Sequence, residues 1–277
     1  MAPPPNLKKY RIGDFARYLG VSADFLKHYE ENGLLLVQPS ESGYRYYGFE
    51  QSGRILEYLR LRSYGVSVKE MQALLEKTPE EAVVELDEKI DKISAEIARQ
   101  QSIVEEHQRF RAWFNEHSCK TSDWEITNTE PYYFLFHSHT SDFIKDEHIY
   151  EILNDWLAWL PITKSALYVR NSSGKPELFW GLAIPESLLK RYNLPVNDAV
   201  VKLTFNKTFV FHFRGVKDAF AMRSIAEGKH PAQETLRKLG FVERGDSLLI
   251  NEMRLSDKEG QPLDGIGRFL IPIRIEE

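Results

Sequence analysis

The sequence predicts an α+β multidomain protein: a winged helix-turn-helix, then a long helix, then a duplicated β-α-β-β domain. Three observations support this prediction. Two short helical pairs flank a Gly-containing segment within residues 10–72, an apolar heptad pattern begins after residue 79, and short apolar alternations recur after residue 124. The predicted domains are residues 1–77, 78–118 and 124–277, and a chain of 277 residues can hold two domains and a connector.

The first helical pair lies in the segment YRIGDFARYLGVSADFLKHYEENGLL. Apolar residues recur at helical spacing over residues 12–19, Gly20 ends that helix, and Ser22 caps the next one. Two short helices joined by a tight turn can place the second helix in a DNA major groove. The segment therefore predicts DNA binding, with Lys27 and His28 of the second helix entering the groove.

The segment ESGYRYYGFEQ then predicts a short hairpin that reverses at Gly43. An Arg among tyrosines on such a wing suits phosphate contacts, although packing around a small domain is the alternative for the tyrosines. RILEYLRLRSYGVSVKEMQALL predicts another helix, a break at Gly65 and a helix capped at Ser67. The residues expected to contact DNA are Arg11, Arg17, Lys27, His28, Tyr29, Arg45, Tyr46, Tyr47 and Arg62. The last four of these are expected to contact phosphates.

Taken together, YRIGDFARYLGVS, HYEENGLL, SGYRYY and LRLRSYGVSVKEM resemble the N-terminal domain of the MerR family of bacterial transcription regulators. The resemblance implies an activator that twists and bends an overlong promoter spacer so that RNA polymerase engages both promoter elements, with phosphate contacts offsetting the deformation energy. The recognition helix departs from the family's Arg-Tyr-Tyr-Glu pattern, because it reads Lys27-His28-Tyr29-Glu30. Lys is a point charge that lacks the bidentate fork of Arg.

Composition is consistent with a soluble cytoplasmic regulator. No apolar run approaches the length of a membrane span, and the MAPPPN start lacks the charged and apolar regions of a signal peptide. The net charge of −5 is unevenly spread, since residues 1–77 carry 11 Lys or Arg against 9 Asp or Glu, whereas residues 78–118 carry 5 against 10. The positive balance thus lies where DNA is expected, and local clustering would supply the attraction.

Thr78 and Pro79 predict the start of the long helix, because a hydroxyl caps well and Pro is tolerated in a first turn. The heptad places Val83, Ile90, Ile97 and Val104 at one position, and Leu86 and Ile93 at the other. This narrow seam favours a coiled-coil homodimer over packing on the same chain, which would need a broader apolar stripe. The family resemblance implies antiparallel pairing of the two helices. The dimer would present two recognition helices to a pseudo-palindromic site in double-stranded promoter DNA.

The single cysteine, Cys119, lies beside His117 at the end of this helix. We predict no metal site, since one thiolate cannot fill a closed site and the eight histidines show no ligand spacing. A partly buried thiol is the simpler interpretation, and no cofactor is predicted.

The C-terminal region predicts two units with the same order of elements. The first unit has a strand at 132–137, a helix at 148–160, and strands at 165–170 and 177–184. The second has a strand at 208–214, the helical segments AFAMRSIAEG and PAQETLRKLG, and strands at 247–255 and 267–275. Such a duplication would place helices over one face of a mixed sheet and leave a cleft near the pseudo-two-fold axis.

This duplication and the closing strand FLIPIRI resemble the GyrI-like effector domains of multidrug-sensing MerR regulators. Such domains often place a Glu in the penultimate strand, where it meets cationic ligands; that position is Leu249 here. The nearest acid, Glu252, lies on the opposite strand face unless a register shift or a bulge intervenes. We therefore expect an apolar or aromatic small-molecule effector. The residues expected to contact the effector are Tyr133, Tyr150, Trp156, Tyr168, Trp180, Phe211, Phe213 and Glu252. For the aromatic residues among them, packing in the core is the alternative.

The sequence thus predicts a ligand-responsive transcription regulator that is not an enzyme, and two alternatives stay open. Some GyrI-like proteins resemble hydrolases that open small electrophilic substrates, and Glu252 or Glu177 would then be the general base. The other alternative is a ligand-independent DNA-binding dimer. No paired carboxylate, Ser-His-Asp or nucleophile motif in the sequence favours the hydrolase.

Overall fold

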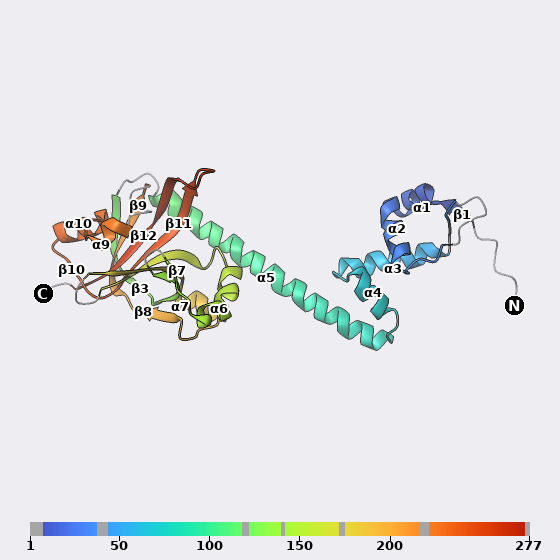
Figure 1. Cartoon of the computed structure of the whole chain (residues 1–277), viewed down its shortest axis with the longest axis horizontal. Coiled ribbons are helices and arrows are strands. Elements are labelled where there is room, and N and C mark those ends of the chain that lie inside the picture. The colour runs from blue at the N-terminus through green and yellow to red at the C-terminus, as the bar shows by residue number, and fades with distance from the viewer. Residues whose placement is uncertain are drawn as a thin grey trace. The chain divides into compact units, whose positions relative to one another are not determined.

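The computed structural model describes residues 8–37, 44–117, 122–139, 142–171, 175–215 and 222–274. The chain divides into two compact units, Met1–Ala98 and Arg99–Glu277, and the long helix α5 (Pro79–His117) begins in the first and ends in the second (Figure 1). The predicted order of helix-turn-helix, long helix and β-sheet domain with helices is confirmed. Within the described part of the chain, no helix combines the length and the apolar character needed to cross a membrane.

The first unit packs short helices around a small antiparallel sheet. The helices are α1 (Ile12–Leu19), α2 (Ala23–Glu31), α3 (Gln51–Ser63) and α4 (Val68–Leu74), and the strands are β1 (Lys9–Arg11) and β2 (Tyr46–Gly48). Gly20 ends α1 in the left-handed conformation, with φ of 68°, which glycine adopts without steric cost. Ser22 caps α2 by accepting the Phe25 amide at 3.0 Å, and Ser67 opens α4 in a capping box.

Strand β2 holds the C-terminal part of the predicted wing. It pairs antiparallel with β1, with Tyr47 opposite Tyr10 and Tyr46 opposite Arg11. The predicted reversal at Gly43 lies outside the described residues. Since Tyr47 is fully buried in the core of the first unit, β2 fixes this end of the wing to that core.

Helix α5 starts where the sequence predicts, and its first turns pack on the first unit. The Thr78 hydroxyl accepts the Glu81 amide at 3.3 Å, while the Glu81 carboxylate accepts the Thr78 amide at 2.9 Å. Leu86, a predicted seam residue, packs instead against the core of the first unit. The exposed seam residues keep 37–64% of their surface free, and they are Val83, Ile90, Ile93, Ile97 and Val104.

The second unit is built on one antiparallel sheet with the strand order β3-β9-β12-β11-β6-β7-β4-β5, where β10 pairs with β12 and β8 with β4. Strands outside the repeats are β3 (Ser122–Thr129), β5 (Asp142–Phe143), β8 (Val200–Leu203) and β10 (Val242–Glu243). The two β-α-β-β units comprise β4 (Tyr132–His139), α6 (Glu147–Ala158), β6 (Lys164–Arg170) and β7 (Glu177–Pro185), then β9 (Asn206–Arg214), α9 (Met222–Ala226), α10 (Pro231–Lys238), β11 (Ser247–Ser256) and β12 (Pro262–Arg274). A further helix, α7 (Glu186–Arg191), follows β7.

The expectation of a mixed sheet is wrong for the described strands, whose pairs are all antiparallel. In each β-α-β-β repeat the last strand inserts between the two strands that the helical segment joins, as in the order β6-β7-β4. The two strands of a repeat that run parallel therefore do not pair with each other. The two repeats meet through β6 and β11, where Tyr168 lies opposite Leu248.

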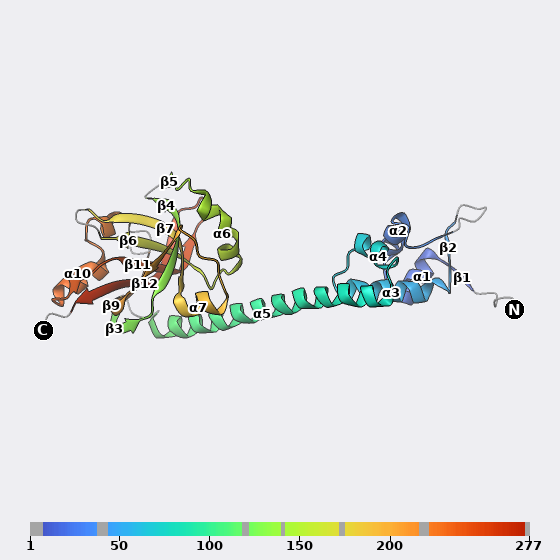
Figure 2. The same cartoon turned by 90° about the horizontal axis from the view of Figure 1, so that it is seen from below.

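The helices of the repeats cover one face of this sheet. Strand β7 contributes Leu178 to the core beneath α9 and α10, and Leu182 to the core beneath α6 and α7. Its alternate residues Phe179 and Ala183 point to the opposite face. The C-terminal turns of α5 lie along that opposite face, where Trp113 Nε1 donates to His212 Nδ1 at 3.0 Å (Figure 2).

Candidate functional site

The first unit buries two of the residues predicted to contact DNA. Tyr29 and Tyr47 are 1% and 0% exposed. The Tyr47 ring stacks on Phe15 with a centroid distance of 5.3 Å, and the Tyr29 ring stacks on Phe25 at 4.2 Å. Burial, with Glu30 nearby, raises the pKa of Tyr47 to about 12. Packing, the alternative interpretation, accounts for both rings.

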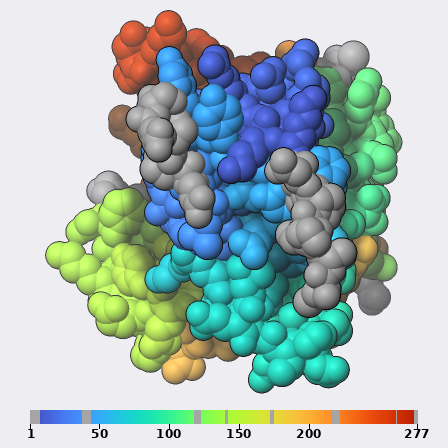
Figure 3. Space-filling view, turned by 90° about the vertical axis from the view of Figure 1, so that its right-hand side faces the viewer, coloured from blue at the N-terminus to red at the C-terminus, as the bar shows by residue number. Residues whose placement is uncertain are grey.

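The other predicted DNA-contact residues keep accessible surface. On α2, the Lys27 ammonium lies 2.9 Å from Asp24, and His28 is exposed beside it. The Arg45 guanidinium lies 3.3 Å from the Glu30 carboxylate. Figure 3 looks onto the first unit, whose blue surface carries α1 and α2. The remaining accessible members of the set are Arg11, Arg17, Tyr46 and Arg62.

A surface hollow of about 640 Å³ brings α2 together with the turn between α3 and α4. His28 and Arg62 line it, as does Ser22 at the N-terminal end of α2. The free amides and the dipole of a helix N-terminus favour an anion, and a guanidinium forms charge-assisted hydrogen bonds with phosphate oxygens. The hollow is therefore chemically suited to a phosphate beside α2.

The second unit contains a cavity of about 290 Å³ between α5 and the face of the sheet along which α5 lies. Its apolar side includes Phe110 and Trp113 of α5, together with Tyr132, Ile162 and Leu188. Its polar side includes carboxylates and cations in equal number, namely Glu106, Glu130, Glu252, Arg109, Lys164 and Arg268.

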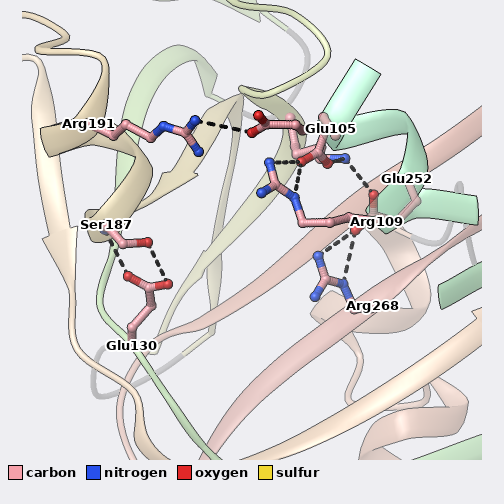
Figure 4. A network of polar contacts seen from close by, with 9 residues as sticks. Glu105, Arg109, Glu130, Ser187, Arg191, Glu252 and Arg268 are labelled. Atoms are coloured by element: carbon pink, nitrogen blue, oxygen red, sulfur yellow. Dashed lines mark hydrogen bonds and ion pairs between the residues drawn. The ribbon is translucent and has the colours of Figure 1, made fainter. Parts of the chain in front are cut away.

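Glu252 lies at the centre of the charged side of this cavity (Figure 4). Its side chain is only 3% exposed and accepts hydrogen bonds from Lys164 Nζ at 2.8 Å and from Arg268 Nη2 at 2.5 Å. Burial raises the pKa of Glu252, but the two cations outweigh burial and hold it below its usual value. Glu252 is thus an ionised, doubly paired carboxylate.

Strand alternation places Glu252 on the cavity side of the sheet, because Leu248 and Ile250 of β11 lie on the face opposite the repeat helices. Asn251 lies opposite Gly267 and Met253 lies opposite Ile266, so Glu252 is the extra residue of β11. Leu249 packs beneath α10 on the other face of the sheet. Glu252 thus lies on the strand face opposite Leu249, as alternation predicts, and faces the cavity, so the bulge does not bring it to the face of Leu249.

Helix α5 supplies a second carboxylate to the same cluster. Glu106 Oε1 lies 2.5 Å from Lys164 Nζ, with the two side chains 9% and 12% exposed. Neighbouring Arg109 also pairs with Glu106, at 2.9 Å. Glu105 of α5 pairs with Arg191 at 3.1 Å outside the cavity wall. Within the wall, Glu130 accepts from the Ser187 amide and hydroxyl.

The structure brings only one of the eight predicted effector residues, Glu252, into the wall of this cavity. Trp156, Phe211 and Phe213 lie in the cores beneath the helices. The Tyr168 hydroxyl donates to Asp246 at 2.6 Å, and Trp180 Nε1 donates to Ser165 at 2.9 Å. Tyr133 borders the α6 core, and the Tyr150 hydroxyl donates to the Ile144 carbonyl.

Sequence reasoning missed Lys164, Arg268 and Glu106. The available signal was a charged residue beside or within an otherwise apolar strand, as in KSALYV and GRFLIPI. Among the residues that the structure describes, no group of three or more His, Cys, Asp or Glu is arranged to hold a metal. Cys119 lies outside the described residues, and His117 stacks on His212 with a centroid distance of 3.7 Å.

Residues 10–78 match the family model described as MerR HTH family regulatory protein. The nodulation protein NolA of Bradyrhizobium diazoefficiens is 33% identical over 97 residues, which cover 34% of this chain and 40% of that protein. The multidrug-efflux transporter 2 regulator of Bacillus subtilis is 34% identical over 106 residues, covering 36% of this chain and 39% of that protein. The chain thus spans about two fifths of the length of these curated relatives.

Solved structures show more distant likenesses. EcmrR in a DNA complex covers 96% of this chain and 100% of its own, at 11% identity and a TM-score of 0.35. A hydrolase from Listeria innocua covers 58% of this chain and 98% of its own, at 11% identity and a TM-score of 0.33. Scores at this level assign no function.

Proposed function

Because residues 10–78 form a helix-turn-helix domain of the MerR family, we propose that this chain is a ligand-responsive transcription regulator that binds double-stranded promoter DNA as a homodimer. The observation that carries the proposal is the first unit, in which a capped α2 exposes Lys27 and His28. The major groove admits an α-helix, and side chains read base edges there. Helix α2 is therefore the recognition helix of the proposal.

Phosphate contacts surround this helix in the proposal. Arg45 is on the wing, Arg62 lines the hollow beside α2, and Arg11 and Arg17 are exposed near α1. Contacts of this kind set the position of the protein on DNA and carry no sequence information themselves. Tyr29 and Tyr47 support the surface by packing beneath it.

Replacing Arg45 with Ala is expected to weaken binding to all DNA sequences by roughly tenfold and to reduce the slope of log affinity against log salt by about 1. The reason is the loss of one phosphate contact, after which Glu30 no longer has its partner at 3.3 Å. Replacing Lys27 with Ala should instead change the preference among sequences. Binding isotherms of the full-length protein at several salt concentrations measure both effects. An Arg45→Ala protein with unchanged affinity and slope would remove the wing from the interface.

The homodimer of the proposal is formed by α5, whose seam residues stay exposed in the single chain. A two-fold dimer would hold two α2 helices towards neighbouring major grooves of one operator. Bending of the bound DNA would then make the promoter accessible to RNA polymerase, with the deformation energy offset by phosphate contacts.

The effector site of the proposal is the cavity in the second unit, because it combines an apolar wall with convergent charged groups. A hydrolytic role for Glu252 is less well supported, since a general base must be free to accept a proton and Glu252 is already paired with two cations. Glu177 lies 3.6 Å from Arg170 and lines no part of this cavity. Incubation with small epoxides and esters tests the alternative, because a hydrolase would turn them over and a regulator would not.

A further inference from the structure

The cavity of the second unit contains a carboxylate that comes from α5. Lys164 Nζ lies between two carboxylates, 2.5 Å from Glu106 Oε1 and 2.8 Å from Glu252 Oε2. All three side chains are almost wholly buried. A buried ammonium needs such partners, because an unpaired charge is strongly disfavoured away from water. The cavity is thus built to hold a carboxylate against Lys164.

The two carboxylates differ in how firmly they are held. Glu252 is on β11, which pairs with a strand on each side, and it accepts from both Lys164 and Arg268. Glu106 is on α5. Its other partner is Arg109, whose guanidinium lies 2.9 Å from the Glu106 carboxylate and whose side chain is half exposed. Glu106 can therefore leave Lys164 and remain paired with Arg109.

We propose that the cavity binds a small aromatic carboxylate, whose carboxylate takes the place of Glu106 on Lys164 and whose ring packs against Phe110 and Trp113. This inference rests on the proposed function of the second unit as the effector domain. The cavity of about 290 Å³ is at the small end for ligand sites, which fits a ligand of one or two rings. Aromatic rings pack well against the two aromatic side chains that α5 supplies.

A cationic ligand fits the same site poorly. Glu252, the carboxylate that such a ligand would seek, is already neutralised by Lys164 and Arg268. A cation would have to displace a buried ammonium or guanidinium, whereas an incoming carboxylate replaces one carboxylate with another. Lys164 is held by both carboxylates, whereas Glu106 keeps Arg109 as a partner when it leaves Lys164.

Exchange at Lys164 would act directly on α5. The same helix packs through Leu86 on the core of the first unit, and Lys89 pairs with Glu70 of α4 at 2.6 Å. Glu106 is thus the residue through which an occupied cavity would change the contacts of α5 within the second unit.

Titration calorimetry with the full-length protein and three matched probes tests the inference: 2-naphthoate, its neutral amide, and 2-naphthylmethylammonium, all at one ionic strength. The acid should bind at least tenfold more tightly than either other probe. Replacing Glu106 with Gln should tighten acid binding by about tenfold or more, because the competing carboxylate is gone. Glu105→Gln is the matched control, since Glu105 pairs with Arg191 outside the cavity wall. Lys164→Met should lose acid binding.

Tightest binding of the ammonium probe would overturn the inference. So would a Glu106→Gln protein that binds the acid no more tightly than Glu105→Gln, or the absence of any binding in both wild type and Glu106→Gln. The proposed function is judged separately, by DNA binding of the same preparations. If the protein binds DNA but prefers the ammonium probe, only the proposed ligand class is wrong. If the protein binds no DNA, the proposed function as a transcription regulator is wrong.

Discussion

Replacing both Ile90 and Ile97 with Asp is expected to make the protein monomeric and to weaken operator binding by at least about 100-fold. In the single chain these side chains are 41% and 64% exposed, so they contribute little to the fold of the chain itself. In a paired seam each Asp would be buried without a partner, which costs several kcal/mol, and each 1.4 kcal/mol is a factor of ten in the equilibrium. Sedimentation velocity and operator titration measure the two effects.

The matched control places the same charges on the other side of the helix. Val84 and Ala95 are exposed and lie outside the two seam positions of the heptad. The double variant Val84→Asp with Ala95→Asp should therefore remain a dimer with normal DNA affinity. If the Ile90 and Ile97 variant also stays dimeric and binds normally, α5 is not the dimerisation helix.

Replacing Arg268 with Met is expected to destabilise the second unit by about 3–5 kcal/mol. Arg268 donates to Glu252 Oε1 through Nε at 3.0 Å and Nη2 at 2.5 Å, and its removal leaves a buried carboxylate with Lys164 alone. All five tryptophans lie within residues 113–180, so their fluorescence during urea unfolding reports on this unit and not on the first.

The pH dependence of this destabilisation has a definite sign. In the intact unit the pKa of Glu252 is lowered, because Arg268 and Lys164 outweigh the effect of burial. Its contribution is therefore present above the ordinary value of 4.5 and fades as the pH falls below it. Loss of Arg268 moves the pKa of Glu252 upwards. The loss of unfolding free energy in the variant, relative to wild type, should therefore be largest near neutral pH and shrink towards pH 4.5.

A double variant separates the buried charge from simple packing loss. Arg268→Met with Glu252→Gln should recover part of the lost stability, because no buried carboxylate is then left without the second of its two cationic partners. Equal stabilities for the single and double variants would show that the ion pair does not hold the unit together.

Much of the fold could be predicted because its signals are local. Gly20, Ser22 and Ser67 set helix boundaries through backbone conformation and capping, which depend on a few neighbouring residues. The two β-α-β-β units follow from alternation and from turn residues. The burial of Tyr29 and Tyr47 could not be read in this way, since an exposed and a buried tyrosine look alike until the helices are packed.

The cavity depends on contacts that no local pattern records. Glu106, Lys164, Glu252 and Arg268 come from a helix and three strands, and their meeting depends on the register of β6, β11 and β12. The bulge at Glu252 shifts that register by one residue. The aromatic residues singled out in the sequence mostly fill cores, as aromatic side chains commonly do.

Selection from a random duplex library, followed by hydroxyl-radical footprinting, measures whether a dimer of this protein reads DNA through α2. We expect enrichment of one pseudo-palindromic sequence, protected symmetrically about its centre, and a changed sequence preference for Lys27→Ala. Failure to enrich any palindromic sequence would contradict reading by a dimer. If the double variant with Lys27→Ala and His28→Ala selected the same sequence as wild type, α2 would not be the helix that reads the bases.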